Sequence, residues 1–271
     1  MDGTLLDRDG KVNARSAEII SRLSRRGALV TVATARTPAT VEELLADTYT
    51  DIPAIVMTGA AMWDRKAKRY IEPVLHSPEA LPELMEVFHA AGVNPFIYVL
   101  GEDGVLRVYH NGKMNRYESR FYEERRYLGL KKFVLDSPEG LMMPIPGTIL
   151  VFAVGESDVI ESVAGCLSHD ARLSVSCYRD IFNHDIAFIE VFGSGVSKSS
   201  AVRRLAEMVG ADRLTVYGDN LNDLSMMAVA DDAVAVANAV PEVLDKASRH
   251  IGPNTHSSVA CDMESVFDAG L

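Results

Sequence analysis

Cysteine and basic residues are scarce in this sequence of 271 residues. Its three cysteines, Cys166, Cys177 and Cys261, show none of the CxxC spacing of a zinc or redox site. They sit in or beside apolar segments, so we expect buried, reduced thiols. Lysine and arginine number 27 against 38 aspartate and glutamate, a formal net charge of −11. This charge argues against unaided binding to nucleic acid or an anionic membrane, although a local basic pocket can still hold a small phosphorylated ligand.

Long hydrophobic runs are absent as well. No uninterrupted apolar stretch approaches the ~18 residues needed to span a bilayer, and the N-terminus has no basic region followed by an apolar stretch. Together with reduced cysteines, this predicts a cytoplasmic protein with neither a membrane nor a nucleic-acid partner. The hydrophobic fraction of 48% suffices for a sizeable core in one large domain or two smaller ones.

Strand and helix signals alternate in both outer parts of the chain. Short, largely apolar runs occur at residues 29–33, 54–57, 214–217 and 233–236, and helical patterns separate them. Such runs are typical of strands that are covered on both faces. The sequence therefore predicts the α/β class, with a Rossmann-like parallel sheet and helices on both faces.

The middle of the chain has a different pattern. Two apolar runs within residues 96–109 flank a Glu-Asp-Gly turn, which indicates an antiparallel hairpin. Further strands near 149–154 and 173–177, with helical patterns among them, extend this region. We predict one α/β core domain at residues 1–76 and 186–271 and an α+β domain inserted into it at residues 77–185.

Polar residues occur in four separated segments, each where a predicted strand gives way to a loop or a helix begins. These segments are residues 2–4, residues 34–36, Lys198 and residues 218–223. Ligands of open parallel sheets collect at the carboxyl ends of the strands. We therefore expect the four segments to converge on one crevice.

The residue types in these segments suit phosphoryl transfer, which requires positioning and charge neutralisation. Asp219 can offer an oxygen to Mg2+ and Asp223 can orient ligands, while Lys198 neutralises phosphate. The Thr34 hydroxyl and the Asn222 amide add polar contacts. Taken singly, each has a plain structural interpretation, such as a surface lysine, a strand-end hydroxyl or a helix cap. Their joint order favours a phosphate and metal site.

The sequence resembles the haloacid dehalogenase superfamily, in particular the Cof-type phosphatases with a large cap (subfamily IIB), essentially from end to end. The resemblance is carried by DGTLL at residues 2–6, Thr34 with Arg36, GVSK at 195–198, GDNLND at 218–223 and Asn238-Ala239. It implies Mg2+-dependent hydrolysis of phosphate monoesters of small metabolites, sugar phosphates or similar, through an aspartyl-phosphate.

The first motif of that family is DxDGT. The resemblance implies that Asp2 is the second aspartate, which acts as acid and base and offers its backbone carbonyl to the metal. It further implies the following roles: catalysis by Asp2 and Lys198, phosphate binding by Thr34, Ala35, Lys198 and Asn222, and metal binding by Asp2, Asp219 and Asp223. Ala35 stands where the family usually has Gly, and Thr58 where it has Asn.

The nucleophilic aspartate of the family would lie immediately before Met1, as would the central strand that precedes it. We therefore expect this chain by itself to be inactive, and we interpret Met1 as an internal methionine of a protein that begins upstream. One alternative is a pseudoenzyme that binds phosphate ligands without turnover, and another is a phosphomutase of the same capped group.

Substrate choice is expected to depend on the cap. Tyr178, Arg179, Asn183 and His184, which lie just before the chain returns to the core, are candidates for substrate contact, and Arg36 is a candidate at the cap interface. The same residues equally suit a plain exposed loop or a solvated charge. Neither the physiological substrate nor the oligomeric state is defined by the sequence.

Overall fold

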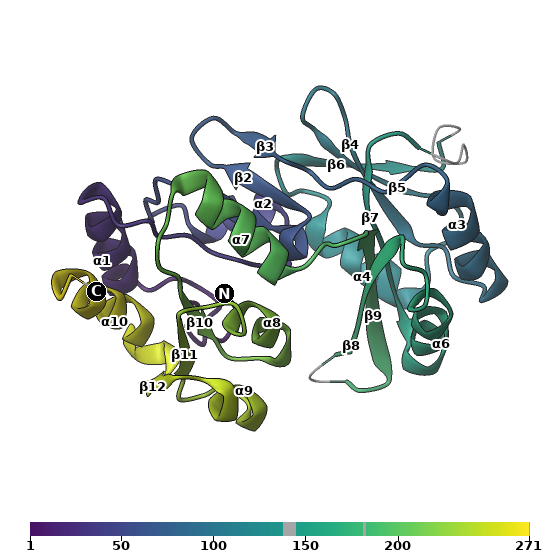
Figure 1. Cartoon of the computed structure of the whole chain (residues 1–271). Coiled ribbons are helices and arrows are strands. Elements are labelled where there is room, and N and C mark those ends of the chain that lie inside the picture. The colour runs from purple at the N-terminus through teal and green to yellow at the C-terminus, as the bar shows by residue number, and fades with distance from the viewer. Residues whose placement is uncertain (138–144, 181–182, 271) are drawn as a thin grey trace. The chain divides into compact units, whose positions relative to one another are not determined.

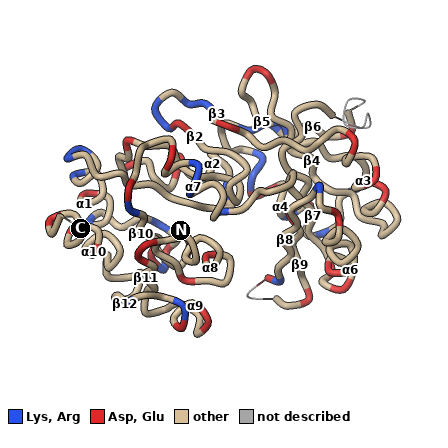
Figure 2. The backbone as a smooth tube through the Cα atoms, viewed as in Figure 1, with Lys and Arg blue, Asp and Glu red and all other residues tan. Residues whose placement is uncertain are grey.

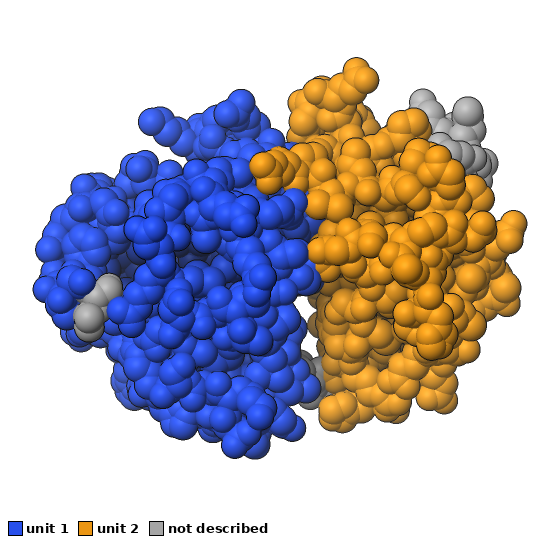
Figure 3. Space-filling model, viewed as in Figure 1, with its two compact units in different colours: residues 1–71, 197–271 blue, residues 72–196 orange. Residues whose placement is uncertain are grey.

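The structure is a computed structural model that describes residues 1–137, 145–180 and 183–270. It divides into two compact units (Figure 3): unit 1 is Met1–Ile71 with Ser197–Leu271, and unit 2 is Glu72–Val196. The expected boundaries at 76 and 186 differ from these. Residues 186–193 pair with two strands of unit 2, and the His76 N–H donates to the carbonyl of Thr148 (2.8 Å), so both border segments belong to unit 2.

Unit 1 alternates helices and strands (Figure 1). Its helices are α1 (Ala14–Arg25), α2 (Pro38–Leu44), α7 (Lys198–Val209), α8 (Leu224–Met227), α9 (Pro241–Lys246) and α10 (Ser258–Asp268). Its strands are β1 (Ala54–Val56), β2 (Ala61–Asp64), β3 (Arg69–Ile71), β10 (Thr215–Gly218), β11 (Asp232–Val236) and β12 (Arg249–Ile251). Short 3-10 turns are η1 (Met57–Gly59), η2 (Leu221–Asp223) and η3 (Asn254–His256). The predicted α/β class is confirmed.

The strands of unit 1 form two three-stranded sheets. The order β10-β11-β12 is parallel, and β1-β2-β3 is antiparallel. Every residue of β11 is buried, as the continuously apolar run at 233–236 predicts. One hydrophobic cluster includes Ile55 of β1, Val216 of β10 and Leu205 of α7, so a common core unites both sheets.

The strand predicted at residues 29–33 is present only in part. The Ile55 N–H donates to the Val32 carbonyl (2.9 Å), and the Thr34 N–H donates to the Ile55 carbonyl (3.0 Å). These bonds form a single parallel bridge, Ala33 to Ile55, and within the described residues this segment pairs with no other strand. A regular strand requires a longer ladder of hydrogen bonds than this single bridge. Leu29, at the start of the segment, is 51% exposed and not buried as a covered strand would be.

Unit 2 is a six-stranded sheet with three described helices. The helices are α3 (Ala80–Ala90), α4 (Arg116–Arg125) and α6 (Ser157–Leu167). The strands are β4 (Phe96–Leu100), β5 (Leu106–His110), β6 (Lys131–Leu135), β7 (Thr148–Glu156), β8 (Leu173–Arg179) and β9 (Ile186–Gly193), in the order β6-β5-β4-β7-β9-β8. All neighbours are antiparallel except β5 and β6, which run parallel.

The two faces of this sheet differ in composition because successive strand residues point to opposite sides. Apolar residues of α3 and α6, such as Phe88 and Ile160, form a buried cluster with Val151 and Ile189. Aromatic rings line the other face, where Phe152 packs on Phe121 of α4 with ring centroids 4.6 Å apart. The α+β character expected of the insert is therefore present in unit 2.

The cysteines are less buried than expected. Cys166 and Cys177 are exposed and Cys261 is half-buried. Cys177 lies on β8, the last strand of its sheet, where one edge faces outward. The expectation of buried thiols is therefore wrong for the first two. In the part of the chain that the structure describes, no helix is long and apolar enough to cross a membrane.

Arg249 connects helix α10 to the parallel sheet. Its guanidinium donates to Asp262 of α10 (2.7 Å) and to Asp232 of β11 (2.9 Å), and the Tyr217 hydroxyl also donates to Asp262 (2.7 Å). Burial works to raise the pKa of Asp262, but the hydrogen bonds from Arg249 and Tyr217 outweigh it and hold that pKa below its usual value.

A pH dependence of stability follows from this lowered pKa. Ionised Asp262 stabilises the fold fully above the unfolded-state pKa of about 3.9, and this contribution disappears as the pH falls through the lower folded-state pKa.

Asp262→Asn should reduce the free energy of unfolding by about 2 kcal/mol at pH 7. Urea unfolding should show a smaller loss at pH 3. The control Asp268→Asn removes an exposed pair with Arg26 and should change little. An equal loss for Asp262→Asn at both pH values would contradict the assignment.

Candidate active site

The N-terminal turn sits directly on the end of β10. The Thr4 hydroxyl donates to Asp219 Oδ1, and the Asn238 amide donates to the Gly3 carbonyl (2.7 Å). Gly3 has a φ of +69°, and a Cβ atom at this position would overlap the carboxylate of Asp219. Only glycine adopts this conformation and this close approach at low cost. The first and fourth predicted segments therefore meet.

Lys198 and Asp223 form a buried ion pair. Lys198 is the first residue of α7, where the Ser197 side chain caps the helix. Its Nζ lies 2.8 Å from Asp223 Oδ1, and the two side chains are 5% and 4% exposed. Asp223 Oδ2 accepts the N–H groups of Asp219 (3.1 Å) and Asn220 (3.3 Å). Burial works to raise the pKa of Asp223, but the charge of Lys198 outweighs it and lowers that pKa.

Arg36 links the segment after residues 29–33 to the N-terminal turn. Its Nε and Nη2 atoms donate to the two carboxylate oxygens of Asp2, at 3.0 and 2.6 Å. Its backbone N–H donates to the hydroxyl of Thr34 (3.2 Å), which is 3% exposed. Burial works to raise the pKa of Asp2, but Arg36 outweighs it, so that pKa lies below its usual value.

The amino group of Met1 completes the cluster. Burial lowers its pKa, in opposition to the attraction of Asp223 and Asp219, while the Lys198 charge lowers it further. Burial also raises the pKa of Asp219. Acidic positions gather where β10 ends, beside the N-terminus (Figure 2). All four predicted segments thus contribute to one site in unit 1.

The donors of this site suit Mg2+ in type. Mg2+ prefers carboxylate and carbonyl oxygens and keeps several waters, and the Asp219 carboxylate and the Asp2 carbonyl are such donors. Asp223 suits an orienting role instead, since Lys198 and two N–H groups occupy its oxygens. Across the described residues, no group of three His, Cys, Asp or Glu side chains is placed to hold a metal.

Other candidate residues lie apart from these contacts. Asn222 is exposed on η2, and Ala35 lies in the turn that Thr34 and Arg36 form. Tyr178, Arg179, Asn183 and His184 belong to unit 2, whereas Arg36 belongs to unit 1.

The unit 2 candidates are engaged locally. Arg179 forms an ion pair with Glu161 of α6 (2.8 Å) and donates to the His184 carbonyl (3.4 Å). Tyr178 stacks on Phe188 with ring centroids 5.4 Å apart.

Sequence reasoning gave no role to three residues that hold the site together. Thr4 bonds Asp219, and Asn238 bonds Gly3 and also accepts the Asn254 N–H (2.9 Å). The Asn254 amide in turn donates to the Leu6 carbonyl (2.6 Å). Of these three residues, Asn238 was noted in the sequence as part of the family resemblance. The sequence does not show, however, which carbonyl the side chain of an asparagine bonds.

The fold of unit 1 and the polar residues gathered after β10 have the pattern that the sequence shares with the haloacid dehalogenase type. The family described as haloacid dehalogenase-like hydrolase matches residues 1–262, so the chain belongs to this family.

Curated relatives match this chain over nearly its full length and over nearly their own. The Bacillus subtilis 5-amino-6-(5-phospho-D-ribitylamino)uracil phosphatase YwtE is 27% identical and covers 96% of this chain and 93% of its own. The Escherichia coli pyridoxal phosphate phosphatase YbhA is 24% identical, with 96% and 94% covered.

Solved structures share the fold. A haloacid dehalogenase-like hydrolase from Bacteroides thetaiotaomicron has a TM-score of 0.76 at 20% identity, covering 98% of this chain and 97% of its own. The subclass IIB sugar phosphatase BT4131 has a TM-score of 0.72 at 19% identity, with 98% and 96% covered.

Removal of the Lys198 charge should destabilise the fold, because it leaves the buried carboxylate of Asp223 without its counter-charge. We expect Lys198→Met to reduce the free energy of unfolding by about 3 kcal/mol, and the double variant Lys198→Met/Asp223→Leu to recover part of this loss. Urea unfolding of both variants measures the difference. Lys246→Met, at an exposed pair with Asp245, is the control and should stay within about 0.5 kcal/mol of the parent. An equal loss in the single and double variants would show that the pair is not the cause.

Thr58, which stands where the family has Asn, has a backbone conformation that favours asparagine over threonine. Its φ is 57° and its ψ 20°, in the left-handed region, where a β-branched side chain is strained and asparagine is tolerated. We expect Thr58→Asn to stabilise the chain by about 1 kcal/mol, a rise in Tm of about 3 °C. Thr58→Val, which keeps the branch, should show no gain in the same thermal scan. The strain argument fails if the asparagine variant melts no later than the parent.

Proposed function

We propose that this chain provides the site of a Mg2+-dependent phosphatase for small phosphorylated metabolites, sugar phosphates or similar. The observation that carries the proposal is the single cluster of Asp2, Asp219, Asp223 and Lys198, which come from the N-terminal turn, the segment after β10 and the start of α7. The names of the curated relatives, which are phosphatases of a ribityl phosphate and of pyridoxal phosphate, support this substrate class.

The residues of the site have complementary roles in this proposal. Lys198 lies at the start of α7 and neutralises negative charge on a phosphoryl group, and the Thr34 hydroxyl lies in the same site as a polar contact. Arg36 holds Asp2 ionised, the state in which a carboxylate accepts a proton from water. Bound at the Asp219 carboxylate and the Asp2 carbonyl, Mg2+ would supply further charge neutralisation at the phosphate oxygens.

The attacking group is the remaining requirement. Asp2 is bonded to Arg36, Asp219 to Thr4 and Asp223 to Lys198, so each of these carboxylates already has a partner. An aspartyl-phosphate route needs one further carboxylate within reach of this cluster.

A second candidate is a binding protein without turnover. The engagement of all three carboxylates, together with the buried charge of Lys198, favours a site that holds a phosphate ester without attacking it. The two candidates share the ligand and differ in the product.

Phosphate release separates the candidates. We expect the chain to release phosphate from a panel of sugar phosphates at least about 1000-fold more slowly than the same chain with one aspartate joined before Met1, because a carboxylate nucleophile raises the rate by several orders of magnitude. Chelation of Mg2+ should abolish the faster rate. Calorimetry should show phosphate binding to both chains, weakened at least about tenfold by Lys198→Met and unchanged by the exposed Lys246→Met.

Two results would contradict the phosphatase proposal. Phosphate binding without release by the extended chain would favour the binding protein. Binding that is insensitive to Lys198→Met would remove the site from both candidates.

A further inference from the structure

Unit 1 has a pocket of about 560 Å³ to which no residue of the active site contributes. Residues 46–52 line one side of it, and the end of β2 with the turn that follows lines another. Ser21 and Arg25 of α1 also contribute. Pockets of about 300–1,000 Å³ are typical of small-molecule sites. This pocket is therefore large enough for a ligand of its own.

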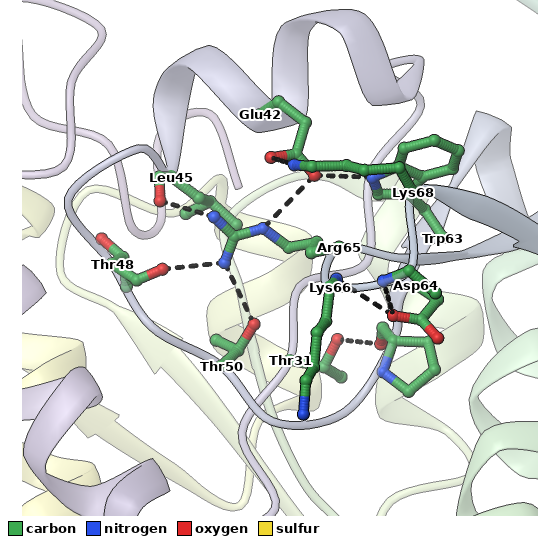
Figure 4. A network of polar contacts seen from close by, with 12 residues as sticks. Thr31, Glu42, Leu45, Thr48, Thr50, Trp63, Asp64, Arg65, Lys66 and Lys68 are labelled. Atoms are coloured by element: carbon green, nitrogen blue, oxygen red, sulfur yellow. Dashed lines mark hydrogen bonds and ion pairs between the residues drawn. The ribbon is translucent and has the colours of Figure 1, made fainter.

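Hydrogen bonds from Arg65 join the two sides of this pocket (Figure 4). Its guanidinium donates to the carbonyls of Thr48 (2.7 Å) and Leu45 (2.6 Å) and to the hydroxyl of Thr50 (3.2 Å). These bonds tie the turn after β2 to the segment at residues 46–52. Because the walls are fixed before a ligand binds, binding has a lower cost in conformational entropy.

The charges that line the pocket balance each other. Four side chains are basic and four are acidic, namely Arg25, Arg65, Lys66 and Lys68 against Glu42, Asp47, Asp51 and Asp64. Three of the carboxylates already accept hydrogen bonds: Glu42 from the Trp63 indole (2.6 Å), Asp51 from the Tyr49 hydroxyl (2.7 Å) and Asp64 from the Lys66 N–H (3.0 Å). Most of the acceptors in the pocket are therefore engaged.

Two of the basic side chains are not engaged in the same way. Within the described residues, neither Lys66 nor Arg25 forms an ion pair. The Arg25 guanidinium lies over the ring of Tyr49, 5.3 Å from its centroid. The side chain of Lys66 extends away from the carboxylate of Asp64 (Figure 4). Both residues are exposed, so both cations are accessible to an anion in the pocket.

Two buried donors of the pocket are unsatisfied as well. Arg65 Nε has no hydrogen-bond partner in the described part of the chain, because the carboxylate of Glu42, at 3.7 Å, is too distant. The hydroxyl of Thr48, a residue that is 3% exposed, has no partner there either. Burial lowers the pKa of Arg65, against the attraction of Glu42. Unsatisfied buried donors cost free energy, which a nearby acceptor recovers.

We propose that this pocket binds a small metabolite through one oxyanion, a phosphate or carboxylate group, at a site separate from the active site. The oxyanion pairs with Lys66 and Arg25 and accepts a hydrogen bond from the Thr48 hydroxyl. A small anion fits better than a polyanion, because the lining has no excess of positive charge and the exposed Asp47 repels further negative charge. The inference does not depend on the proposed function.

Amide hydrogen exchange of the full chain tests this site with two probes, inorganic phosphate and malonate. We expect at least one of them to slow exchange within residues 46–52 and 64–68 at least about threefold. Protection by phosphate alone would identify a phosphate ester as the class of ligand, and protection by malonate alone a carboxylate. The amides of Asp219 and Asn220 report the active site separately.

Removal of the two accessible cations should abolish this protection. We expect Arg25→Met/Lys66→Met to bind the effective probe at least about tenfold more weakly than the parent. The fold should be retained, since both side chains are exposed. Arg120→Met/Lys246→Met, which changes two exposed cations outside the pocket, is the matched control and should bind as the parent does.

Thr48→Val separates binding from stability. The change removes an unsatisfied buried hydroxyl, so Tm should not fall, whereas binding of the probe should weaken about fivefold. Protection by neither probe, or equal protection in the parent and in Arg25→Met/Lys66→Met, would overturn the inference. Phosphate release is measured separately with the aspartate-joined chain, so either proposal can fail while the other stands.

Discussion

The buried carboxylate of Asp223 is the interaction on which the active site depends. One of its oxygens holds Lys198 at the start of α7, and the other accepts the N–H groups of Asp219 and Asn220 after β10. A single side chain therefore fixes a helix start and a strand end in one geometry. Because the pair is almost fully buried, either partner alone would be an uncompensated charge in a medium of low polarity.

The other contacts of the site join further segments to the Asp223–Lys198 pair and its neighbours. The N-terminal turn rests on Asp219 through Thr4 and Gly3, and Arg36 joins that turn to the segment after residues 29–33. The same turn brings the Met1 amino group into the cluster. Charge of both signs is thus concentrated at one edge of unit 1, as a phosphate and metal site requires, within a chain of formal net charge −11.

Some of this arrangement could be predicted from the sequence and some could not. The convergence of Asp219 with the segment at residues 34–36 was expected because ligands of parallel sheets collect at the carboxyl ends of the strands, whereas Lys198 begins a helix. The boundary at residue 186 was misplaced, because an apolar run such as β9 can pair in either unit and only its partners, β7 and β8, decide. The run at 29–33 was predicted as a full strand, but a strand is defined by its neighbours, and one edge here has none within the described residues.

What the sequence by itself determined is the set of residue types and their order: carboxylates and a lysine at strand ends and helix starts, in the pattern of one enzyme family. What only the tertiary structure decided is which atoms meet. Asp2 faces Arg36, Asp223 faces Lys198, and Thr4 bonds a carboxylate 215 positions away. Such pairings depend on packing between distant segments, whereas the local pattern depends only on near neighbours, and so a sequence pattern can predict a site without predicting its hydrogen bonds.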